Sequence, residues 1–121
     1  MMGAGASYQY INILSYTYPG NGIISNRDSF FVYLSETIPI GTKVHFKVPF
    51  TQLDSNVTEL RIRDSAASPN DIVISPIPQL VDVEFVTTDR NTNILWCFFD
   101  ANVQDTRFDK ANLIVEKIVK V

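Results

Sequence analysis

The stretch KVHFKVP, residues 43–49, alternates apolar and polar side chains along its whole length. Its apolar parity holds Val44, Phe46 and Val48, and the other parity holds two lysines and His45. Successive side chains of a β-strand point to opposite faces of the sheet, so this pattern predicts a strand with one buried and one solvated face. Residues 43–49 therefore favour a fold built from half-buried strands.

Seven further stretches have the composition of strands, and the period of a helix is nearly absent. They are residues 8–18, 29–35, 58–64, 71–76, 80–88, 93–100 and 111–121. Turn-forming residues separate them at intervals of roughly 8 to 15 residues, which is typical of all-β domains. The chain therefore predicts an all-β fold: a single antiparallel β-sandwich of about eight strands, jelly-roll-like or Greek-key in its connections.

The limits of the domain also follow from composition. Residues 1–7, MMGAGAS, predict a flexible N-terminal arm, and residues 8–121 predict the β-sandwich domain. The polar segment 102–112 is expected to form at most one turn of helix. Prolines flank residues 71–76, so this stretch predicts an edge strand that cannot pair further.

The stretch NILWCFFD, residues 93–100, is apolar on both parities. A strand of this kind is expected at the centre of a sheet, covered on both faces. The predicted core is Phe46, Ile62, Phe85, Trp96 and Phe98.

Charge and hydropathy exclude several classes of partner. The chain carries 10 Lys and Arg against 13 Asp and Glu, a net charge of −3, and its cations are scattered. We therefore expect no nucleic-acid partner, because a phosphate backbone needs a basic patch. No stretch approaches the ~20 apolar residues of a membrane helix. The first ten residues lack the basic and apolar regions of a secretory signal, so we expect no membrane insertion and synthesis in a host cytoplasm.

The residues that carry catalysis in hydrolases are nearly absent. His45 and Cys97 are the single histidine and the single cysteine. His45 stands between Lys43 and Lys47 and predicts a solvated surface histidine, whereas Cys97, inside LWCFF, predicts a buried structural thiol with a raised pKa. A catalytic triad needs a nucleophile, a base and an orienting carboxylate, and no such set is evident. The sequence predicts a protein that is not an enzyme and has no cofactor.

Three aspartates fall in one connection, at Asp100, Asp105 and Asp109. A loose calcium site is one interpretation of this cluster. Ordinary turn and capping aspartates are the preferred one, and no metal site is predicted.

Four of the five tyrosines lie within residues 8–18, YQYINILSYTY, and all four fall on even positions. Tyr8, Tyr10, Tyr16 and Tyr18 would leave one face of an extended strand and form an outward contact stripe. Aromatic side chains with a polar tip are enriched where one protein meets another. The alternative is that the strand bends, switches sheets and buries half of the tyrosines.

These observations favour an assembly role. We expect a virion (phage) accessory protein, such as a capsid decoration, head-fibre or baseplate domain, located in the virion. Its expected partners are itself, as a homo-oligomer, and other structural proteins of the assembly. The alternatives are a carbohydrate-binding module, in which tyrosines would stack on sugars, and an immunoglobulin-like adhesion or spacer domain. Carbohydrate-binding modules usually expose tryptophan as well, and Trp96 lies in the stretch predicted to be most buried.

Overall fold

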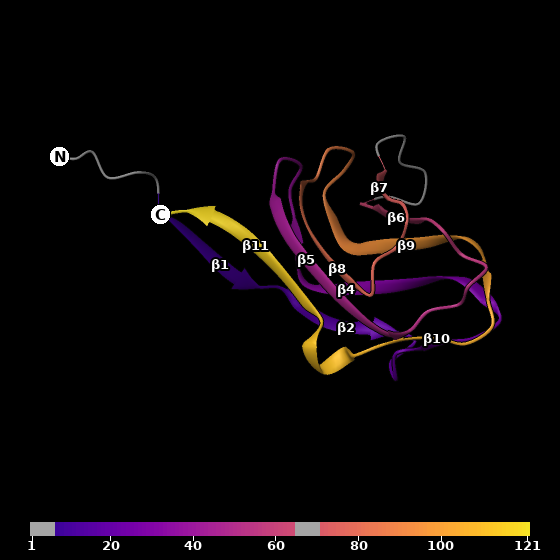
Figure 1. The fold of residues 1–121 in the computed structure, drawn as a ribbon. Helices are drawn as coiled ribbons and strands as arrows, with labels where there is room; N and C mark the ends of the chain where they lie inside the picture. Colours follow the sequence, from indigo (N-terminus) through magenta and orange to yellow (C-terminus); the bar gives the residue numbers. More distant parts are fainter. Residues whose placement is uncertain (1–6, 65–70) are drawn as a thin grey trace.

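The computed structural model describes residues 7–64 and 71–121. They form an all-β fold with two antiparallel sheets, which confirms the predicted class (Figure 1). Of the predicted arm, residues 1–7, all but Ser7 lies outside the described residues. No helix in the described part of the chain is long and apolar enough to cross a membrane.

The first sheet has the strand order β1–β11–β5–β10–β3, and β8 pairs with the other edge of β5. Its strands are β1 (Tyr8–Asn12), β3 (Ile23–Ile24), β5 (Lys43–Gln52), β8 (Leu80–Val86), β10 (Thr106–Phe108) and β11 (Ile114–Lys120). Strand β5 corresponds to the alternating stretch that predicted the fold. The 3-10 turn η1 (Lys110–Asn112) precedes β11 and lies within the limit of one helical turn that was expected for residues 102–112.

The second sheet has the order β2–β4–β9–β6–β7. Its strands are β2 (Leu14–Tyr18), β4 (Arg27–Ile38), β6 (Leu60–Arg63), β7 (Ile72–Ile74) and β9 (Thr92–Val103). Strand β9 contains the stretch predicted to be central, and it lies in the middle of the sheet. Among the described residues, strand β7 pairs only with β6, as predicted for the proline-flanked edge strand.

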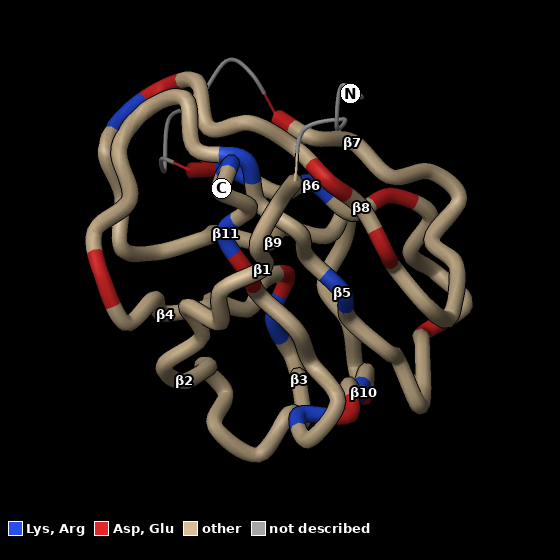
Figure 2. The backbone as a smooth tube through the Cα atoms, turned by 90° about the vertical axis from the view of Figure 1, so that its left-hand side faces the viewer, with Lys and Arg blue, Asp and Glu red and all other residues tan. Residues whose placement is uncertain are grey.

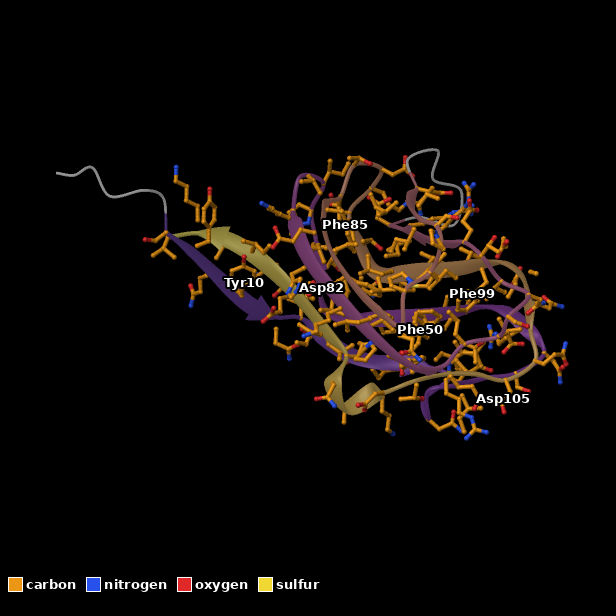
Figure 3. The ribbon with its side chains drawn as sticks, viewed as in Figure 1. Tyr10, Phe50, Asp82, Phe85, Phe99 and Asp105 are labelled. Carbon is orange, nitrogen blue, oxygen red and sulfur yellow. The ribbon has the colours of Figure 1, made fainter. Side chains whose placement is uncertain are left out.

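The apolar faces of the two sheets pack together in a sandwich-like arrangement. Buried side chains of both sheets form one cluster, in which Phe30 and Phe99 of the second sheet contact Phe50 of the first. Figure 3 shows Phe50, Phe85 and Phe99 between the strands. Of the predicted core, Phe46, Ile62 and Phe85 are buried.

The predicted burial of Trp96 and Phe98 is wrong. Both are only partly buried, because they lie on the outward parity of β9, while Leu95, Cys97 and Phe99 occupy the inward parity. No third layer covers them in the described residues. Their surroundings are instead the side chains of neighbouring strands on the same face.

The strand predicted over residues 8–18 is divided at Ile13. The Ile13 N–H donates to the carbonyl of Val115 in the first sheet, at 2.9 Å, and its own carbonyl accepts from the N–H of Ser35 in the second, at 2.8 Å. Residue 13 therefore carries the chain from one sheet to the other. This division, with the short strands β3 and β10, gives the strands β1–β11 where about eight were expected.

Strands β1 and β11 extend beyond the body as a two-stranded ribbon (Figure 1). Their register runs from Asn12 opposite Glu116 to Tyr8 opposite Lys120. Strand β5 pairs with β11 only as far as Lys43 opposite Ile118. The last residues of the ribbon therefore have no neighbouring strand in the described structure except each other.

Candidate functional site

All four predicted site tyrosines are exposed, at 50–60% of their surface. They do not form one continuous stripe, because the change of sheet at Ile13 separates them. Tyr8 and Tyr10 lie on the outer face of the first sheet, and Tyr16 and Tyr18 lie on the outer face of the second. The expected alternative was half correct: the strand switches sheets, but no tyrosine enters the core.

Tyr16 and Tyr18 join other aromatic residues on the second sheet. The strand register places Tyr16 opposite Tyr33, and Tyr33 opposite Ile94. It also aligns a second row across four strands. This row is Tyr18, Phe31, Trp96 and Arg63. We call the outer surface formed by Tyr16, Tyr18, Phe31, Tyr33, Trp96 and Phe98 the aromatic face.

The rings of the aromatic face contact one another in two groups, the pair Tyr16 and Tyr33 and the series Tyr18, Phe31, Trp96 and Phe98. Tyr16 and Tyr33 stack with their centroids 4.4 Å apart and their planes at 10°. Phe31 stacks against Tyr18 at 6.3 Å and meets Trp96 edge-on at 5.0 Å. Such contacts are worth about 0.5–1.5 kcal/mol beyond the area they bury. They fix the rings in place without a covering layer.

Arginines border the aromatic face. The guanidinium of Arg27 lies over the rings of Tyr18 and Phe31, 4.8 and 5.4 Å from their centroids, and that of Arg63 lies 4.7 Å from the centroid of Phe98. The Nε of Arg63 also lies 2.8 Å from Asp71 Oδ1. Among residues 7–64 and 71–121, Arg27 has no carboxylate partner, and its buried Nε has no hydrogen-bond acceptor.

Most of this face was not predicted, although the sequence contained a signal for it. In SFFVYLS, residues 29–35, Phe31 and Tyr33 share a parity opposite to that of the buried Phe30 and Val32. In residues 93–100, apolar residues on both parities were interpreted as burial on both sides. This pattern equally indicates an aromatic outer face, and only the cross-strand register distinguishes the two.

On the outer face of the first sheet, His45 is held between two carboxylates. Its Nδ1 lies 2.9 Å from Glu116 Oε1 on β11, and its Nε2 lies 2.7 Å from Asp82 Oδ1 on β8. The side chain is 18% exposed, so the expected solvated histidine is instead largely covered. Partial burial lowers the pKa of His45, but the hydrogen bonds to both carboxylates outweigh it, so its pKa is raised.

Tyr10 covers this histidine from β1, on the far side of β11. Its ring meets the imidazole edge-on at 6.0 Å, and its hydroxyl donates to Glu84 Oε2 at 3.4 Å. The cluster joins β1, β11, β5 and β8 across the width of the sheet. Figure 3 shows Tyr10 and Asp82 near the base of the ribbon. The arrangement stabilises the sheet and contains no nucleophile beside the histidine in the described structure.

The three aspartates of the possible calcium site have different partners. Asp100 accepts hydrogen bonds from Thr58 and Glu59, Asp105 from Arg107, and Asp109 from the N–H of Ala111. The bonds from Thr58 lower the pKa of Asp100, and the bond from Arg107 lowers that of Asp105. In the described ranges, no group of three His, Cys, Asp or Glu side chains could hold a metal ion.

Two further features bear on chemistry. Cys97 is fully buried, and burial raises the pKa of its thiol. A shallow pocket lies along β2, lined by Leu14, Ser15, Tyr16, Thr17, Gly20 and Lys110. Of its lining, Lys110 is the cation, and its Nζ donates to the carbonyl of Gly20 at 3.2 Å.

Charged residues are interspersed over the surface rather than gathered in one area, as Figure 2 shows. The aromatic face, where side chains of one kind do gather, is therefore the candidate functional site of the described structure. No protein-family model, curated protein or solved structure matches the chain.

Proposed function

We propose that this protein is a non-enzymatic assembly module that docks onto other structural proteins through the aromatic face. The composition of that face carries the proposal. Tyrosine, tryptophan, phenylalanine and arginine are the residues enriched at the centres of protein interfaces, where a few of them supply most of the binding energy. Six aromatic rings and Arg27 come together here, on strands β2, β4 and β9.

The guanidinium of Arg27, which has no carboxylate partner among the described residues, indicates what the partner presents. It rests on two rings, and none of the described residues offers it a carboxylate. A carboxylate that met this guanidinium would form a charge-assisted, bidentate hydrogen bond in a partly dehydrated setting. We therefore propose that the docking partner places an Asp or Glu at Arg27, beside an apolar surface that covers the rings.

The proposed setting is a virion. We expect the sandwich to be jelly-roll-like or Greek-key in its connections, with interaction surfaces on its outer faces. Such a domain suits a phage accessory protein, for example a capsid decoration, head-fibre or baseplate domain. Its partners would be a second copy of itself and a structural protein of the particle. Neighbouring genes for a terminase, portal or tail protein would support this setting.

The test is co-sedimentation with particles assembled from the genome that encodes this chain. The wild type is expected to sediment with particles that lack their own copy. A Tyr16→Ser, Tyr18→Ser double variant and, separately, Arg27→Gln are expected to remain in the supernatant with an unchanged circular dichroism spectrum. Ile40→Ser is the matched control, because Ile40 is also exposed, at 54%, but lies outside the aromatic face. Docking by all variants alike would contradict the proposal.

A carbohydrate-binding module is the second candidate, and one observation favours it. Trp96, expected in the core, lies at the surface with its ring within 2° of parallel to that of Phe98. Parallel rings on a sheet can stack on sugar rings. Against this, the faces of several rings are already occupied, since Tyr16 stacks on Tyr33 and Arg63 lies over Phe98. A glycan array that gave binding abolished by Trp96→Ala would favour this candidate over protein docking.

A further inference from the structure

The open edge of β1 is, with that of β2, a sheet edge of the described structure that carries no charged residue and no proline. Natural sheets block pairing at their edges with short strands, prolines or charged side chains. Strand β7 is short and is followed by Pro76 and Pro78, and β8 points Asp82 and Glu84 outward. Strand β3 has two residues. By contrast, β1 has no charged residue and no proline, and it lies in the projecting ribbon.

The hydrogen bonds of β1 show which of its backbone groups are free. Ser7 pairs with Val121 through a hydrogen bond, and Ile13 pairs with Val115 in the same way. Bonded pairs alternate in an antiparallel ladder, so the odd residues of β1 direct their N–H and C=O groups to β11. The even residues, Tyr8, Tyr10 and Asn12, therefore direct theirs to the open edge.

The side chains leave this edge accessible. The ring of Tyr10 leans over β11, where it contacts His45 and its hydroxyl reaches Glu84. The side chain of Asn12 turns back along its own chain and accepts from the N–H of Leu14 at 3.2 Å. Tyr8, Tyr10 and Asn12 thus offer a row of backbone donors and acceptors that no described residue pairs with.

We propose that β1 pairs with β1 of a second copy of this chain, antiparallel and about a two-fold axis through Tyr10. This inference rests on the proposed assembly role and names the contact between copies. With Tyr10 opposite Tyr10 of the second copy and Tyr8 opposite its Asn12, every free group of the edge meets a complementary one. The first sheets of the two copies then form one continuous sheet.

The outer side chains are compatible with this register. The central row across the junction is Ile118, Tyr10, Tyr10 and Ile118, because Tyr10 lies opposite Ile118 within each copy. Each flanking row runs from Lys120 through Tyr8 to Asn12 and Glu116 of the second copy. Apolar side chains therefore meet at the axis, and opposite charges stand at the two ends of each flanking row. A closed two-fold pair also leaves no further β1 edge exposed.

Proline at residue 8 provides the first test. Tyr8 is the first residue of its strand, its N–H faces the open edge, and proline removes that donor without breaking a bond to β11. The matched control is Tyr8→Ala, which removes the same ring and keeps the N–H. Light scattering is expected to give twice the chain mass of 13.7 kDa for wild type and Tyr8→Ala, and the chain mass for Tyr8→Pro.

A thiol at the axis provides the second test and does not depend on Tyr8→Pro folding. Opposing Cα atoms of a bonded antiparallel pair lie about 5.5 Å apart. Tyr10→Cys is therefore expected to be joined between copies by a short bis-maleimide, whereas Val73→Cys, exposed on the edge strand β7 of the second sheet, is not. Cys97 is buried and does not interfere.

A monomeric wild type, a dimeric Tyr8→Pro, or equal cross-linking of the two thiol variants would overturn the pairing. Failure of the proposed docking function is distinguishable from these outcomes. If particles are not bound but the Tyr8→Pro and Tyr10→Cys results are as expected, the aromatic face has another role and the β1 pairing holds. The Tyr16→Ser, Tyr18→Ser variant is expected to remain dimeric, because neither residue lies in β1.

Discussion

Trp96 and Phe98 stand two residues apart on β9, with their rings 6.4 Å apart and within 2° of parallel. They occupy the outward side of the most central strand of the second sheet, where the sequence predicts core. Neighbouring rings and the guanidinium of Arg63 cover them in part. A central position of a strand in its sheet usually coincides with burial of its side chains. Here it does not, because the outward side chains of β9 are only partly buried.

The stability of the fold should therefore depend less on Trp96 than on a true core residue. Phe46→Ala removes a fully buried ring and is expected to cost about 3–5 kcal/mol. Trp96→Ala leaves a surface hollow that water can enter and is expected to cost about 1–3 kcal/mol. Urea unfolding of both variants measures the difference. An equal loss would place Trp96 energetically in the core.

Stability should fall as the pH rises through the titration of His45. Its folded-state pKa is raised by Glu116 and Asp82, so protonation stabilises the folded protein. This contribution is complete below the unfolded-state pKa of about 6.5 and is lost as the pH rises through the raised folded value. Urea midpoints measured on both sides of this range are expected to fall for the wild type. His45→Gln lacks the titrating group, so an identical fall in that variant would contradict the assignment.

Two glycines with positive φ provide a matched pair. Gly22 has φ +76° and Gly41 has φ +91°, so alanine at either position adopts a left-handed backbone at a cost of about 1–2 kcal/mol. At Gly22 the added Cβ would also lie 2.6 Å from the carbonyl oxygen of Phe108, whereas at Gly41 it meets nothing within 4 Å. Thermal unfolding should therefore show a larger loss for Gly22→Ala. The reverse order would show that the β3–β10 contact can move apart.

The thiol of Cys97 should be unreactive toward thiol reagents in the folded protein. It is fully buried and its pKa is raised, so little reactive thiolate forms. Ellman's reagent is expected to react with one thiol per chain in denaturant and with almost none before unfolding. Rapid reaction in native buffer would show that β9 opens locally on the time scale of the assay.

The fold class followed from the sequence because alternation is a local property. Val44, Phe46 and Val48 repeat at the period of a strand, and no other chain segment is needed to interpret them. The central position of β9 in the second sheet was predicted from another local property, the apolar residues on both parities of residues 93–100. The predicted burial on the outer side of β9 was wrong, because burial there depends on whether a further layer covers the sheet.

The division at Ile13 and the His45 cluster depend on tertiary contacts. No glycine or proline interrupts residues 8–18, so nothing local marks the change of sheet. It is imposed by Val115 and Ser35, which bind the two sides of one residue. The partners of His45 are likewise brought together by the register of β8 and β11, which lie far from it in the sequence.

The ribbon of β1 and β11 also determines how the molecule responds to load. Ser7 and Val121 are paired at its tip, so a force that pulls them apart breaks one bonded pair at a time, as a zipper opens. Opening reaches Ile13 next to the body. There the same residue is held by both sheets, and the resistance rises because β4 shares the load through Ser35. Under such a force the ribbon extends easily while the body keeps its shape. Extension stops at Ile13, where both sheets hold the chain.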